Sequence, residues 1–393
     1  MGGGLMQLVA YGAQDIYLTG NPQITFFKVV YRRHTNFSME AIEQTWNGTA
    51  TGSDGRCTAT ISRNGDLVHR MYLEVGGTSA DTLNPGASVV KSVELEIGGQ
   101  KIDKHTGLWM EVWSELSQEN QLGTTATLTT NSTAAPTGLT KFQRTTGMGG
   151  IDGAAGIACN FTVPLYFWFC RNPGLALPLI ALQYHEVKVI LEHAHNTVFT
   201  ASPVNKLWCD YIYLDTDERR RFAQVSHEYL IEQVQEQSLS ASTSNDLNFN
   251  HPVKELIWTR SVAGSGSLDY AATQPPIANS TETYQLKLNG HDRFAARAQS
   301  YFARTQVMES HSGYGGINSS VVAGVGEAND GICVYSFALK PEEHQPSGTC
   351  NFSRIDNAQL VSSAAVQSQC VIYAVNYNVL RIMSGMGGLA YSN

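Results

Sequence analysis

One short pattern occurs twice in this chain of 393 residues. Val93–Gly99 and Tyr284–Gly290 both alternate apolar and polar residues and then reach glycine, and Leu286 follows Leu95 by 191 positions. Alternation with a period of two is typical of a half-buried β-strand, and the glycine indicates a turn. The repeat therefore predicts two β-domains of similar construction.

A second pair of segments repeats in the same order. Tyr166–Pro173 is similar to Tyr335–Pro341, and Tyr335 follows Tyr166 by 169 positions. The order is kept while the spacing shrinks, as expected if one β-domain was duplicated and a loop differs in length between the copies. The length of the chain suits two all-β domains.

Strand-like runs fill both halves of the chain. The segment 105–116 has helical spacing, and 24–31 fits either a strand or a helical turn. The clear runs are 37–46, 57–62, 67–75, 89–97, 161–170, 184–192 and 207–214 in the first half and 227–237, 247–258, 284–288, 332–339, 349–361 and 370–382 in the second, with a weaker run at 301–307.

These runs predict an all-β fold of two tandem eight-stranded antiparallel jelly-roll β-sandwiches, with an N-terminal arm and short connecting helices. The charged segment at 215–224 separates the two series of strands. We expect an arm at 1–24, a first jelly roll at 25–215, a linker at 216–225 and a second jelly roll at 226–393.

The arm is apolar but too short to form a core. Its Leu5, Leu8, Val9 and Tyr11 must therefore dock on another surface, and we interpret them as assembly residues. We also expect the connection at 107–119 to bury apolar surface between subunits.

Charge argues for contacts with protein rather than nucleic acid. Only 15% of the residues are charged, against about 25% in typical soluble domains, so much of the surface is expected to be covered by other chains. The net charge of −8 argues against direct nucleic-acid binding, which needs clustered Lys and Arg. Arg219–Arg221 follow Asp215 and Asp217, so local ion pairing is the simpler interpretation.

The seven cysteines form no CxxC pair and no metal-ligand spacing. They indicate reduced thiols in a protein assembled in the cytosol. Seven Asn-x-Ser/Thr triplets occur, and those in loop-like sequence are candidate glycosylation sites, at Asn131, Asn279 and Asn318.

Evidence for catalysis is weak. His193 and His195 lie on one face of an extended segment, where a solvated strand end is favoured over a metal site. Ser265 lies between two glycines in a Ser/Gly-rich stretch without the strand-turn-helix context of a nucleophile. We expect no catalytic residues, no metal and no cofactor.

Several longer segments resemble one protein family, the major capsid proteins of the large nucleocytoplasmic DNA viruses, especially those of algal viruses. They run from the arm to the C-terminus in the order of that family. The segments are 8–15, 18–27, 31–33, 61–67, 174–187, 346–357 and 377–391.

The resemblance implies tandem jelly rolls and a homotrimer whose six barrels form a pseudo-hexagonal capsomer. Such capsomers tile the icosahedral shell of a large dsDNA virus around an internal membrane, which they do not span. Neighbouring capsomers, minor capsid proteins and penton proteins are the implied partners, with assembly in the host cytoplasm. The alternatives are a lectin-like β-sandwich module that binds glycans and, third, a jelly-roll glycan hydrolase, which would need a carboxylate pair in a cleft.

Overall fold

A computed structural model describes residues 3–80, 82–118, 126–127, 140–152, 156–201, 203–261, 273–277, 279, 281–313, 315 and 330–391. The chain divides into two compact units, residues 1–36 and 37–393. The first contains the short helices α1 (Gly3–Val9) and α2 (Ile16–Thr19). The ambiguous run at 24–31 forms neither a helix nor a strand.

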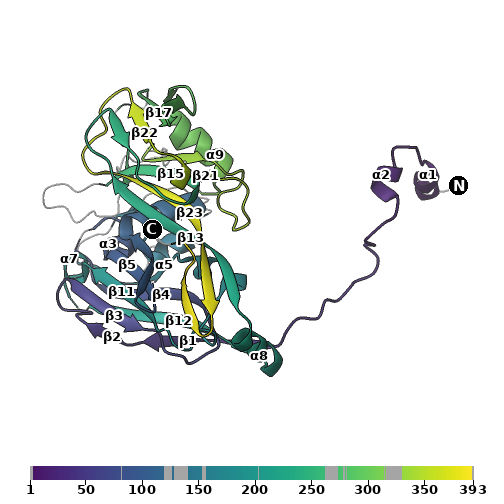
Figure 1. Ribbon diagram of the computed structural model, residues 1–393, viewed down its shortest axis with the longest axis horizontal. Coiled ribbons are helices and arrows are strands. Elements are labelled where there is room, and N and C mark those ends of the chain that lie inside the picture. Colours follow the sequence, from purple (N-terminus) through teal and green to yellow (C-terminus); the bar gives the residue numbers. More distant parts are fainter. Residues whose placement is uncertain are drawn as a thin grey trace. The chain divides into compact units, whose positions relative to one another are not determined.

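The second unit begins with a sandwich of two antiparallel sheets (Figure 1). In the first sheet the order is β1-β12-β4-β10, and β9 also pairs with β4. The order in the second sheet is β2-β3-β11-β5-β6. Their bounds are β1 Phe37–Gln44, β2 Trp46–Gly48, β3 Gly55–Thr60, β4 Leu67–Thr78, β5 Val90–Ile97, β6 Gln100–Thr106, β9 Ala158–Pro164, β10 Leu177–Pro178, β11 Val187–His193 and β12 Val204–Leu214.

A second sandwich follows, again of two antiparallel sheets. The order of the first sheet is β13-β23-β15-β16, with β20 and β21 on β15 and β24 on β23, and the other is β14-β22-β17-β18, with β19 on β17. Their bounds are β13 His227–Ser238, β14 Ser244–Asp246, β15 Pro252–Ser261, β16 Thr273–Gln274, β17 Thr283–Leu288, β18 His291–Asp292, β19 Arg297–Ala298, β20 Ile332–Ser336, β21 Cys350–Asn351, β22 Ala358–Ser362, β23 Cys370–Met383 and β24 Met386–Leu389.

The two sandwiches share one topology. Four strands of one sheet, in the order β1-β12-β4-β9, correspond to β13-β23-β15-β20 in the second sandwich, which pair in the same way. Four strands of the other sheet correspond likewise, β3-β11-β5-β6 to β14-β22-β17-β18. Two packed antiparallel sheets with this order form a jelly roll, so the predicted double jelly roll is confirmed.

Short helices and a small parallel pair lie in the connections. β7 (Ala126–Thr127) pairs with β8 (Ile151–Asp152) in parallel. The helices are α3 Pro85–Ser88, α4 Gly107–Ser117, α5 Lys141–Thr146, α6 Trp168–Arg171, η1 Pro173–Leu175, α7 His195–Val198, α8 Thr216–Gln224, η2 Tyr301–Thr305, α9 Gln306–Ser310 and η3 Phe352–Arg354.

Two predicted strands differ from the structure. The run at 161–170 is a strand, β9, only as far as Pro164, whose missing N–H cannot continue a ladder, and residues 168–171 form α6. The weak run at 301–307 is helical, since it lies in η2 and α9. The helix expected within 105–116 is confirmed as α4.

The hydrophobic core of the first sandwich extends into the junction with the second, which also has a separate core of its own. Val93 and Leu95 of β5 belong to the same buried cluster as Ile231, Ile257 and Tyr373 of the second sandwich. Alternate residues of a strand point to opposite sides of the sheet. Ile257 and Tyr373 therefore face the first sandwich, whereas their neighbours Trp258 and Ile372 belong to the core of the second. The two sandwiches therefore share packed contacts instead of meeting only through a linker.

Candidate assembly interface

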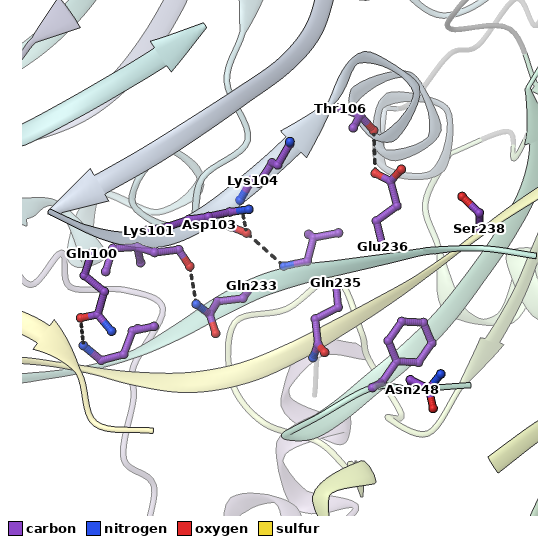
Figure 2. A pocket seen from close by; sticks show the side chains of 14 residues that line it. Gln100, Lys101, Asp103, Lys104, Thr106, Gln233, Gln235, Glu236, Ser238 and Asn248 are labelled. Carbon is purple, nitrogen blue, oxygen red and sulfur yellow. Dashed lines mark hydrogen bonds between the residues drawn. The ribbon is translucent and has the colours of Figure 1, made fainter. Parts of the chain in front are cut away.

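The junction between the sandwiches brings together two edge strands, β6 and β13 (Figure 2). The backbone N–H of Val234 donates to Asp103 Oδ1 at 3.2 Å, and the side chain of Gln233 donates to the carbonyl of Ile102. An unpaired strand edge is a template for association with another chain. Here side chains from one edge satisfy backbone groups of the other and close both.

A groove of about 710 Å³ lies along this junction. Figure 2 shows polar side chains from both strands along it, including Lys101 and Lys104 of β6 and Gln235 of β13. The hydroxyl of Thr106 donates to Glu236 Oε2 at 3.2 Å across the junction. The groove is thus part of the contact between the two sandwiches.

Glu232 of β13 lies at the centre of a buried group of charges. Its carboxylate is 2.8 Å from both Lys254 Nζ and Arg171 Nη1, and 3.7 Å from His344 Nδ1. Lys254 is fully buried, and Arg171 comes from the first sandwich. Burial alone raises the pKa of Glu232, but the contacts with His344, Lys254 and Arg171 outweigh burial and lower it to about 2. One carboxylate therefore holds a cation from each sandwich.

Helix α4 ends against a segment of the second sandwich. The N–H of Gly313 donates to the carbonyl of Leu116 at 2.7 Å, and the N–H of Gly315 donates to that of Glu115 at 2.9 Å. The last carbonyls of a helix have no partner within it, so this segment caps α4. Residues 107–116 are buried within the single chain. The expectation that the connection at 107–119 covers a contact between subunits was therefore wrong, because the helix lies inside the molecule.

His311 anchors the capping segment. Its buried ring has Nε2 at 2.9 Å from Glu255 Oε2 and Nδ1 at 3.1 Å from Glu342 Oε1. Burial alone lowers the pKa of His311, but the two carboxylates outweigh it and raise the pKa to about 9. The ring is therefore a cation at neutral pH, and it meets Trp113 of α4 edge-on.

The hairpin β23–β24 completes the junction. The N–H of Tyr184 donates to the carbonyl of Gly385 at 2.9 Å, and the N–H of Leu389 donates to Gln100 Oε1 at 3.2 Å. The C-terminal strands are thereby attached to the first sandwich as well as to their own.

The predicted site residues that the structure describes lie in both units of the chain. Leu5, Leu8, Val9 and Tyr11 lie in the first unit, with 56%, 79%, 68% and 59% of their surfaces exposed. Asn279 is exposed, whereas Asn131 and Asn318 lie outside the described residues.

His193 and His195 are buried, so the expected solvated strand end was wrong. Each imidazole contacts a backbone carbonyl, that of Thr49 at 2.7 Å and that of Val204 at 2.8 Å. Within the described ranges, His, Cys, Asp and Glu side chains form no group of three that could hold a metal ion. No helix in that part of the chain is long and apolar enough to cross a membrane.

Sequence reasoning missed the junction residues. One signal was present: inside a predicted strand, Lys254 and Glu255 lie between the apolar residues Val253 and Leu256–Trp258. Buried charges need partners, so such an interruption indicates a buried ion pair. Their partners Glu232 and His311 are remote in sequence and could not be assigned from it.

Comparison with known proteins agrees with the fold. Residues 25–215 match the family described as "Major capsid protein N-terminus", and residues 218–388 match "Large eukaryotic DNA virus major capsid protein". The major capsid protein of Pyramimonas orientalis virus is 52% identical over 420 residues, and that of Paramecium bursaria Chlorella virus 1 is 41% identical over 469 residues, each with 100% of both chains covered.

Solved structures show the same relationship. The chain in the quasi-atomic structure of the PBCV-1 virus capsid aligns with a TM-score of 0.75 at 37% identity, covering 94% of this chain and 100% of that one. The Faustovirus major capsid protein, at 14% identity, shares the fold with a TM-score of 0.63, covering 95% of this chain and 94% of that one. The chain therefore belongs to the major capsid proteins of the large eukaryotic DNA viruses, and it is a structural component of the virion capsid and not an enzyme.

Proposed function

We propose that three copies of this chain form a homotrimeric capsomer of pseudo-hexagonal outline, which tiles the icosahedral shell of a large dsDNA virus. The supporting observation is that one chain holds two sandwiches of the same topology in a fixed junction. Three copies around a three-fold axis present six similar units, which a hexagonal array can repeat.

The proposed partners are neighbouring capsomers, minor capsid proteins and penton proteins. An internal membrane lies nearby and is not spanned, and the genome is not contacted directly. The net charge of −8 supports the last point, because binding of phosphates needs an excess of cations. Assembly takes place in the host cytoplasm.

The proposed division of the chain has an arm at 1–24, jelly rolls at 25–215 and 226–393, and a linker at 216–225. It is supported by the strands β1–β12, which end at Leu214, and by β13, which begins at His227. Between them α8 carries the charged residues expected of the linker.

The exposed apolar arm is proposed to dock on a neighbouring protein through Leu5, Leu8, Val9 and Tyr11. Deletion of residues 1–24 should leave the melting temperature of the capsomer within about 2 °C of that of the intact protein, because the arm belongs to a separate compact unit. The same deletion should reduce the yield of closed shells in a reconstitution with partner proteins. Shells formed at the intact yield would refute this role.

Of the three proposed glycan acceptors, Asn279 lies within the described residues. It is exposed, and the hydroxyl of Thr281 in the same triplet donates to Asn279 Oδ1 at 2.9 Å. Asn131 and Asn318 remain candidates from sequence. An N279Q variant isolated from virions should lose the mass of one glycan. If the measured mass exceeds the mass calculated from the sequence by the same amount in the variant and the wild type, this site is refuted.

The trimer is tested by native mass and by particle images. A mass of about 128 kDa, three times 42.8 kDa, and a hexagonal outline are expected. A monomer at all concentrations would refute the proposal. Saturable binding of a defined glycan by that monomer would instead favour the lectin-like alternative.

A further inference from the structure

Two hairpins occupy equivalent positions in the two sandwiches. In the first, Ile97 of β5 faces Gln100 of β6, and in the second, Leu288 of β17 faces His291 of β18. Both turns have positive φ at their two central residues, 58° and 84° at 98 and 99, and 50° and 78° at 289 and 290. These values require glycine or asparagine in a tight hairpin turn. The residues after the second turn, 291–297, are therefore equivalent to β6.

The equivalent edges differ sharply in exposure. On β6, Ile102, Asp103 and His105 keep 3%, 4% and 1% of their surface. The side chain of Gln233 and the N–H of Val234, both on β13, donate to the Ile102 carbonyl and to Asp103 Oδ1. Along 291–297, all residues are exposed except the half-buried Phe294. The edge used at the junction in the first sandwich is thus left uncovered in the second.

The opposite edge shows the reverse difference. β13 contributes Ile231, Glu232 and Gln233 to the junction, and each is buried. Its equivalent β1 is exposed along most of its length, and Phe37 and Met39 keep 53% and 48% of their surface. β1 pairs only with β12 among the described strands, so its outer edge has no strand partner there.

The two uncovered edges carry opposite charge. The sequence of β1, FSMEAIEQ, contains Glu40 and Glu43 and no cation, and Lys206 of the neighbouring β12 lies 3.5 Å from the Glu43 carboxylate. The segment 291–297 contains His291, Arg293 and Arg297 against a single Asp292. Arg293 and Arg297 lie over the rings of Tyr335 and Tyr301, and both residues are exposed. Complementary charge of this kind favours contact between the edges and fixes its register.

We propose that, in the trimer, the edge 291–297 of one copy docks along β1 of the next copy, in the arrangement that β6 and β13 adopt inside each chain. The inference rests on the proposed homotrimer and names the surfaces that close it. Such a contact joins two different surfaces, so it generates a ring when the rotation closes. Each ring would then contain three junctions inside chains and three similar junctions between chains.

Reversal of charge on either edge tests this contact. The variants are E40R/E43R, R293E/R297E and the combination of all four changes, which restores opposite charges on the two edges. The control E96R/E192R makes the same charge change as E40R/E43R on the outer face of the sheet that contains β5 and β11. Native mass and light scattering measure the trimer over a range of concentrations, and circular dichroism checks folding.

We expect each double variant to be folded and to need a protein concentration on the order of a hundred-fold higher to form trimers. The quadruple variant, which carries all four substitutions, and the control should both assemble like the wild type. If the wild type is trimeric and both double variants assemble equally well, the proposed contact is wrong while the trimer stands. If the quadruple variant is folded but monomeric, the pairing of these two edges is also refuted. A monomeric wild type would refute the trimer itself.

Discussion

Replacing Glu232 with glutamine should be among the most damaging single changes to this protein. The substitution preserves size but leaves Lys254 Nζ, which is fully buried, without the carboxylate at 2.8 Å. Removal of one partner from a buried ion pair typically costs about 3 to 5 kcal/mol. The pKa leads to a similar figure: a decrease from 4.5 to about 2 corresponds to about 3 kcal/mol of stability above pH 4.5.

The matched control is E228Q on the same strand. Glu228 pairs with Arg381 at 2.8 Å, but both side chains are more than half exposed, so its loss should cost at most about 1 kcal/mol. Urea unfolding at one protein concentration, followed by tryptophan fluorescence, measures both variants against the wild type.

The pH dependence provides a second check. Because the pKa of Glu232 is lowered in the folded state, its contribution is present above pH 4.5 and is lost as the pH falls toward 2. The difference between the wild type and E232Q should therefore narrow at pH 3. A cost at pH 7 no larger than that of E228Q would refute the reasoning.

Two further predictions concern the same junction. G98A should lower the melting temperature by several degrees more than G99A. Both glycines have positive φ, but an added Cβ at Gly98 lies 2.3 Å from His185 Nδ1, whereas one at Gly99 meets open space. Equal shifts in melting temperature would contradict this reasoning. The pKa of His311 is raised from 6.5 to about 9, so the stability that its charge contributes is complete below pH 6.5 and is lost as the pH rises through 9. The difference in unfolding free energy between the wild type and H311Q should therefore shrink from pH 7 to pH 10. A constant difference would count against a charged ring.

The local pattern of the sequence predicted most of the fold. Val187, Val189 and Leu191 lie on one face of the predicted strand, and in β11 all three are buried. The strand β6 was missed, because its sequence QKIDKHT contains four charged or titratable residues. Asp103 and His105 are nevertheless buried, since their side chains pair at 2.9 Å and Asp103 accepts the N–H of Val234. That partner is 131 residues away, so no local pattern could reveal it.

The candidate site was predicted only in outline. An exposed apolar arm follows directly from its composition, since Leu5 and Leu8 have too few apolar neighbours along the chain to form a core. The contacts that fix the two sandwiches depend on pairs such as Arg171 with Glu232, which the fold alone brings together. Equivalent surfaces of the two sandwiches could be compared only after the topology showed that β1 of the first corresponds to β13 of the second.

The shared buried cluster has a mechanical consequence for a shell. Side chains from β5 and β23 belong to one cluster at the junction, so tilting one half of the molecule against the other would open cavities, which proteins resist strongly. Each molecule should then respond to stress as a stiff plate. Curvature, and any yielding under internal pressure, would be concentrated at the seams between molecules, where the bonding is weaker and can be remade.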